Sequence, residues 1–174
     1  TDADVRHKAI VVLRDCRQAD DAPRIEALLA KSQPNAIRAA VYNALGKLNN
    51  PASFETSIRG LADPVESVVA EAAGAISRLA LLKPGPSEEL HAAARKALLE
   101  RAARPMAETR LRESVLDAMA ALGDAAFLPI LVTHASTDEP DAVVRQAALR
   151  GLGRIGTPEQ ADIVIGRLND SAAG

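Results

Sequence analysis

The stretch from Val144 to Asp170, VRQAALRGLGRIGTPEQADIVIGRLND, decides the fold because the rest of the chain can be aligned with it. Each matching segment opens with an aliphatic residue followed by Arg or, once, by Val: Val5-Arg6, Ile37-Arg38, Val68-Val69 and Leu111-Arg112. Self-similarity at a short interval is typical of proteins that stack one supersecondary unit on the next. We therefore divide the chain into units at residues 1–32, 33–63, 64–105, 106–138 and 139–174.

The first half of each unit has the pattern of an amphipathic helix. We number unit positions from the Arg, or from Val69 in the third unit, so that position three means three residues later. Positions three, four and seven are apolar in every unit and lie on one helical face. We expect these residues to form a buried stripe: Ala9, Ile10, Leu13, Val41, Tyr42, Leu45, Ala72, Ala73, Ile76, Val115, Leu116, Met119, Ala148, Leu149 and Leu152.

The second half of each unit predicts another helix. Asn50-Pro51 and Thr157-Pro158 each supply a helix N-cap followed by Pro at the first helical position. The third unit departs from the pattern, because LLKPGPS at residues 81–87 forbids a helix and a long second helix is expected over 88–103. We also expect a longer first helix there. The predicted fold is an all-α superhelix of about five antiparallel helix pairs with an insertion in the third pair.

Composition narrows the class of protein. The formal net charge of −2 disfavours a general nucleic-acid binder, and no apolar run is long enough for a membrane span. The single cysteine, Cys16, excludes an internal disulfide and slightly favours a reducing compartment such as the cytoplasm. The start, TDADVR, lacks the features of a targeting peptide, so we expect residues 1–174 to be one domain cut from a longer protein.

The pattern V-R-x-x-A-x-x-x-L-G-x-x-G, followed by a Pro-capped helix that ends in L-x-D, resembles the HEAT-like repeats of phycobilisome lyases. The resemblance covers essentially the whole chain, and Val144–Asp170 is its best copy. It implies a right-handed superhelix with first helices on the convex face and second helices on the concave face, used mostly to bind proteins. Val69 stands where the family has Arg, so a ladder of Arg–Asp pairs should be interrupted at the third unit.

Three features of the sequence could indicate chemistry, and each has a simpler structural explanation. GLGRIG at residues 151–156 is a literal G-x-G-x-x-G, but it closes a helix, whereas a dinucleotide-binding loop opens one. The histidines His7, His91 and His134 lie in three different units, and none is next to Glu, so no metal site is expected. Cys16 aligns with Leu48 and Leu79, which favours a small core residue over a nucleophile. We expect no cofactor.

The repeated arginines Arg6, Arg38, Arg112 and Arg145 favour a structural role, because their fixed position lets each reach the turn beside it. Asp63 and Asp141 lie in such turns, and we expect them to join neighbouring units. The alternative is a basic stripe that binds phosphate or an acidic partner.

The third unit's second helix is the most basic segment and includes Arg95, Lys96, Arg101 and Arg104. Nucleic-acid binders add aromatic side chains that stack on bases. Here Tyr42 and Phe54 align with core positions, which leaves only Phe127 free. We therefore disfavour nucleic-acid binding and expect a solvated face.

The leading functional hypothesis is a non-enzymatic scaffold or adaptor that binds a protein partner on its concave face. The second is a phycobilin-lyase-like protein that attaches a tetrapyrrole, and the third is a nucleic-acid-binding module. Because both ends resemble internal units, we also expect end-to-end self-association. The candidate partner-binding residues on the second helices are Arg24, Arg59, Ile130, His134, Ile163 and Arg167.

Overall fold

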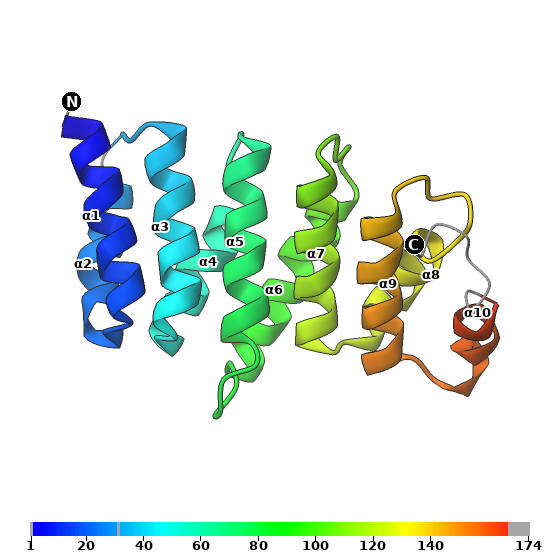
Figure 1. The fold of residues 1–174 in the computed structure, drawn as a ribbon. Helices are drawn as coiled ribbons and strands as arrows, with labels where there is room; N and C mark the ends of the chain where they lie inside the picture. The colour runs from blue at the N-terminus through cyan, green and yellow to red at the C-terminus, as the bar shows by residue number, and fades with distance from the viewer. Residues whose placement is uncertain (1, 31, 167–174) are drawn as a thin grey trace.

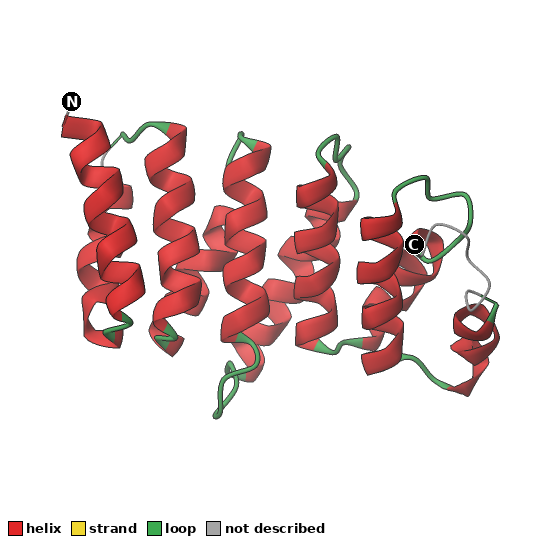
Figure 2. Ribbon diagram, in the orientation of Figure 1, coloured by secondary structure: helices red, strands yellow, loops and turns green. Residues whose placement is uncertain are grey.

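The computed structural model describes residues 2–30 and 32–166, and these residues form ten α-helices joined by loops (Figure 2). Helices alternate between two layers, so each unit is an antiparallel pair (Figure 1). The prediction of an all-α solenoid of helix pairs is confirmed. None of the helices in the described ranges is long and apolar enough to cross a membrane.

The first helices of the units stand side by side in one row (Figure 1). Each packs along the next, because its buried stripe leaves an apolar side toward both neighbours. These helices are α1 (Asp2–Cys16), α3 (Asn35–Leu48), α5 (Glu66–Leu79), α7 (Thr109–Leu122) and α9 (Ala142–Ile155).

The second helices form the other layer and are mostly short. Four of them follow a 3-10 turn. Two of these turns are capped as the sequence predicts, because Asn50 accepts from a backbone amide and Thr157 forms a capping box with Gln160. Asp124 caps a third turn by accepting from the Ala126 amide. The second helices are α2 (Ala22–Glu26), α4 (Phe54–Gly60), α6 (Glu88–Ala102), α8 (Leu128–His134) and α10 (Ala161–Ile165).

Small residues let helices of neighbouring units approach closely. A Cβ built on Gly46 of α3 would lie 2.7 Å from the Cα atom of Ala75 on α5, which is closer than real Cβ contacts. A Cβ on Gly151 of α9 would lie 2.7 Å from a methyl group of Leu131 on α8. These two glycines therefore allow close packing between units, and neither of them forms a turn.

First helices end at the same place in several units. Arg17, Asn49 and Gly123, all at position eleven, have φ values of 52°, 56° and 72°. This left-handed conformation is the usual way to close a helix. Gly156, at the same position of the fifth unit, ends α9 with an extended backbone instead.

Part of the predicted core is wrong at α1, because one side of this helix is exposed. Ala9 and Cys16 are exposed, although their equivalents in α3, α5 and α7 are buried. The reason is position: α1 is the first helix of the row, so no preceding unit of the described chain covers that side (Figure 1).

Two further expectations are wrong. Phe127 is not free, because it ends the 3-10 turn before α8 with its ring fully buried in the core. The first helix of the third unit is not longer than the others, since α5 has 14 residues, as do α3, α7 and α9. The insertion at residues 81–87 instead forms a loop beyond the end of α5, and the long second helix α6 follows it.

Candidate partner-binding surface

A row of arginine contacts joins the units along one edge of the array. Arg38 donates through Nε and Nη2 to the Asp63 carboxylate at 2.8 and 2.9 Å, and through Nη1 to the Gln33 carbonyl at 2.8 Å. Arg6 donates to the Gln33 side chain at 2.7 Å. In both cases the Arg binds the turn that leads into the first helix of the next unit. Such bonds fix the distance between successive helix pairs.

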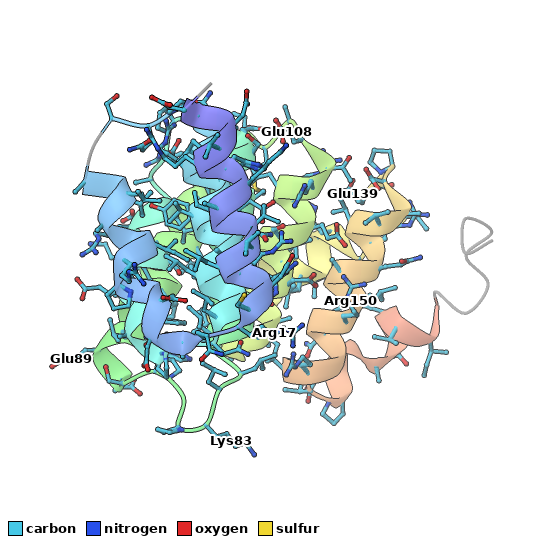
Figure 3. The ribbon with its side chains drawn as sticks, turned by 60° about the vertical axis from the view of Figure 1, so that its left-hand side comes forward. Arg17, Lys83, Glu89, Glu108, Glu139 and Arg150 are labelled. Atoms are coloured by element: carbon cyan, nitrogen blue, oxygen red, sulfur yellow. The ribbon has the colours of Figure 1, made fainter. Side chains whose placement is uncertain are left out.

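The last two units repeat this arrangement. Arg112 lies 3.4 Å from an Asp141 carboxylate oxygen and 3.8 Å from Glu139. Asp141 also caps α9 by accepting from the Val143 amide at 3.0 Å. Arg145 is buried and donates to the Glu139 carbonyl at 2.7 Å. Glu139, labelled in Figure 3, lies in the turn that precedes α9 in the chain.

The third unit joins its successor differently, because Val69 replaces the Arg. Glu66, the first residue of α5, accepts from the backbone amides of Ala107 and Glu108 ahead of α7. Arg101, which is buried on α6, lies 3.4 Å from the same carboxylate and donates to the Pro105 carbonyl. The Glu66 carboxylate of the third unit thus makes the contact with the fourth unit that an Arg makes elsewhere in the row.

These contacts shift the pKa values of the acids. Burial raises the pKa of Asp63, but the hydrogen bonds from Arg38 and from the Val65 amide outweigh it and hold the pKa below its usual value. The pKa of Asp141 is lowered mainly by the hydrogen bond from the Thr109 hydroxyl. The pKa of Glu66 is lowered mainly by the Glu108 amide. All three carboxyls are therefore held in the charged form.

The second-helix face carries an open hollow of about 570 Å³ between the first and second units. Its apolar part comes from α2 and the 3-10 turn that follows it, and its polar part comes mainly from α4. A hollow with apolar walls and a few polar groups is typical of a binding site. The lining residues are Pro23, Glu26, Ala27, Leu29, Ala30, Tyr42, Thr56 and Arg59.

A chain of hydrogen bonds orders the polar wall of this hollow. Thr56 donates from its hydroxyl to Glu26 at 3.2 Å and accepts from Arg59 at 2.8 Å. Arg59 also donates to Glu55 at 3.1 Å. Glu26 lies on α2 and the other three residues lie on α4, so the chain connects two units. The guanidinium of Arg59 is held in place while its side chain stays mostly exposed.

Tyr42 reaches the hollow from α3. Its ring lies against Gly60, where a Cβ would come within 2.6 Å of the ring. Burial raises the pKa of the Tyr42 hydroxyl, and the charge of Asp63 raises it further. The phenol therefore stays protonated and can donate a hydrogen bond.

The predicted partner-binding residues do not form one site. Arg59 lines the hollow, whereas Arg24 is exposed on α2 outside its lining and pairs with Asp21. Ile130 of α8 and Ile163 of α10 are half-buried against the core. His134 lies 2.8 Å from Glu139 in the turn before α9. Arg167 lies outside the described residues.

The basic helix α6 is largely engaged within the protein. Arg95 donates to Asp124 at 2.8 Å, and Arg101 contacts Glu66. Lys96 lies 4.0 Å from Glu100. His91 of the same helix lies 3.1 Å from the Leu122 carbonyl. These contacts give most of the helix's cations and its histidine a structural partner.

Sequence reasoning missed Glu26, Thr56 and Tyr42 in the hollow. Tyr42 was assigned to the core from its unit position, and its ring is indeed buried, but its edge reaches the hollow. Tyr42 is the only tyrosine of the chain, and it takes a unit position where the other units have Ile, Ala or Leu. This difference in chemistry was the signal in the sequence that could have identified it. Within the residues that the structure describes, no three His, Cys, Asp or Glu side chains lie close enough to hold a metal ion.

The last two units resemble a known repeat family. A family model for HEAT repeats matches residues 95–174, which run from α6 through the last two units. No curated protein matched the chain. The match and the row of stacked helix pairs together support a HEAT-like repeat protein.

Proposed function

We propose that the chain is a non-enzymatic interaction module that holds a segment of a protein partner in the hollow between α2 and α4. HEAT repeats commonly mediate protein interaction. The single observation that carries the proposal is the hydrogen-bonded chain Glu26–Thr56–Arg59, which lines the hollow together with apolar residues. Arg and Tyr are enriched where proteins bind proteins, and both line this hollow.

The chemistry of the hollow suits an extended segment with both apolar and acidic groups. Leu29 and Pro23 offer apolar surface, and Arg59 offers a guanidinium whose position is already fixed by Thr56. A pre-positioned side chain loses less conformational entropy on binding than a free one. Asp and Glu side chains, or a chain-terminal carboxylate, are therefore the partner groups that we expect at Arg59.

The proposal is tested with peptides selected from a random library on the 174-residue chain and measured by calorimetry. Arg59→Ala should weaken binding of the selected peptides about tenfold or more, which corresponds to about 1.4 kcal/mol. Arg24→Ala is the matched control, because it removes another exposed arginine of the same layer outside the hollow. Equal affinity of both variants and the original chain would reject the hollow as the site.

The alternative of a tetrapyrrole-attachment protein has less support. The hollow contains one aromatic side chain, Tyr42, and its lining includes neither His nor Cys. Titration with a bilin, followed by absorbance, separates the two functions. A stoichiometric spectral shift would favour the tetrapyrrole protein over the interaction module.

A further inference from the structure

The Tyr42 hydroxyl is a polar group that the fold does not use. The side chain is only 7% exposed, and its hydroxyl has no hydrogen-bond partner among the residues that the structure describes. Packing does not require it either, because the same unit position holds the buried residues Ile10, Ala73 and Leu116 in other units. A buried polar group normally has a partner, so this hydroxyl is available to a ligand.

The hydroxyl lies at the floor of the hollow, beside α4. The ring carbon that carries it, Cζ, would lie 2.6 Å from a Cβ built on Gly60. Tyr42 belongs to α3, in the row of first helices, whereas the other lining residues belong to α2, the turn after it and α4 (Figure 1). Tyr42 therefore reaches the hollow from the layer behind its walls. A partner segment that lies across the opening reaches the hydroxyl with a side chain rather than with its main chain.

Glu26 offers the opposite chemistry in the same hollow. Both Glu26 and Tyr42 line it, and the charge of Glu26 acts on the Tyr42 phenol. Glu26 accepts through Oε2 from the Thr56 hydroxyl at 3.2 Å. A carboxylate accepts several hydrogen bonds, so Glu26 has room for another donor. The hollow thus presents a donor, Tyr42, and an acceptor, Glu26, to one ligand group.

The charges around the phenol favour an uncharged ligand group. Two acids, Glu26 and Asp63, act on it, and so do two arginines, Arg38 and Arg59. There is therefore no excess of positive charge, and Asp63 already holds Arg38 through two hydrogen bonds. A ligand carboxylate beside the phenol would be repelled by Glu26 and has no proton to donate to it.

We propose that the hollow selects its partner by a side-chain amide, from Asn or Gln, whose carbonyl oxygen accepts from Tyr42 and whose NH2 group donates to Glu26. This inference rests on the proposed function, because it names what the bound segment inserts into the same hollow. A side-chain amide carries an acceptor and two donors in one plane, which matches the pair of groups in the hollow. Arg59 stays mostly exposed and binds an acid elsewhere on the segment.

The proposal is tested with peptides selected on the 174-residue chain that contain neither Tyr nor Trp. The chain has one Tyr and no Trp, so the fluorescence of Tyr42 reports binding at the hollow. Replacing the critical Asn or Gln of a selected peptide by Asp or Glu should weaken binding about tenfold or more. Glu26→Gln should reduce this preference, because it removes the charge that repels the acid. Glu55→Gln is the matched control and should keep the preference, since Glu55 contacts Arg59 outside the lining.

Tyr42→Phe separates a role in binding from a role in folding. The variant keeps the ring and loses only the unpaired hydroxyl, so its melting temperature should equal that of the original chain. Its affinity for the amide-containing peptide, measured by calorimetry, should fall about tenfold. A lower melting temperature with unchanged affinity would assign the hydroxyl to the fold and overturn the proposal.

The Arg59→Ala variant distinguishes failure of this inference from failure of the proposed function. Suppose that selected peptides are weakened by Arg59→Ala, bind Tyr42→Phe as tightly as the original chain, and tolerate an acid in place of each amide. That result would overturn the amide proposal and leave the hollow as the binding site. Selected peptides that bind Arg59→Ala as tightly as the original chain would reject both.

Discussion

Arg38 and Asp63 form a two-point ion pair, with Nε and Nη2 of the arginine 2.8 and 2.9 Å from the two carboxylate oxygens. The arginine lies on α3 of the second unit, and the aspartate is the last residue of that unit, in the turn that leads to α5 of the third unit. Because Asp63 also accepts from the Val65 amide at 3.0 Å, one carboxylate both orders the turn before α5 and ties that turn to α3. The unit boundaries are thus fixed by polar contacts as well as by the apolar core.

Asp63→Ala should destabilise the chain by about 2 kcal/mol, because it leaves a half-buried guanidinium without its charged acceptor. Chemical denaturation measures the loss. Glu55→Ala is the control, since the exposed Arg59–Glu55 pair is worth less than about 1 kcal/mol. Equal losses for the two variants would mean that the Arg38–Asp63 pair is no more than a surface contact.

Acid should destabilise the array through the same carboxyls. The folded-state pKa values of Asp63 and Asp141 are below their unfolded values, so the stability that they contribute is fully present above the unfolded pKa of about 4. It is lost as the pH falls through the folded values. The free energy of unfolding, measured at several pH values, should decline below pH 4 and decline less steeply in Asp63→Asn. An unchanged slope in that variant would contradict the assignment.

Two glycine variants should change stability in opposite directions. Gly46→Ala places a methyl group 2.7 Å from the Ala75 Cα atom, so α3 and α5 must move apart at a cost of about 1–3 kcal/mol. Gly153→Ala meets no described atom within 4 Å and should gain up to about 1 kcal/mol from helix propensity. Thermal melts compare them. Stabilisation by both would show that the first helices are not in close contact.

Leu152→Ala should cost about 2–5 kcal/mol, because the side chain is buried between α9 and its neighbours and its loss leaves a cavity. Leu81→Ala removes a half-exposed leucine from the loop after α5 and should change stability little. A cost below about 1 kcal/mol for Leu152→Ala would place the core on another side of α9.

The repeat pattern predicted the fold because each unit carries the same apolar positions. Leu152 and Met119 are buried as expected, since each packs between two units. Cys16 shares that pattern but is exposed, because no helix among the described residues packs on that side of α1, and the repeat pattern does not show this. Phe127 was missed for another reason: a 3-10 turn, whose period differs from that of an α-helix, turns it inward.

The binding surface was less predictable than the core. The hollow forms because α2 and α4 lie apart, and the distance between two helices cannot be read from their short sequences. Arg59 was identified because it is a charged residue off the buried stripe. Thr56 was not, because a threonine that links an acid on one unit to a base on the next has no distinctive sequence neighbours.

The central claim is that the hollow between α2 and α4 holds a protein segment. Amide chemical shifts of the labelled chain, recorded while a selected peptide is added, test it most directly. We expect the largest changes at Glu26, Thr56 and Arg59, and smaller changes on α8 and α9. Changes confined to other helices, with these three amides unmoved at saturation, would contradict it.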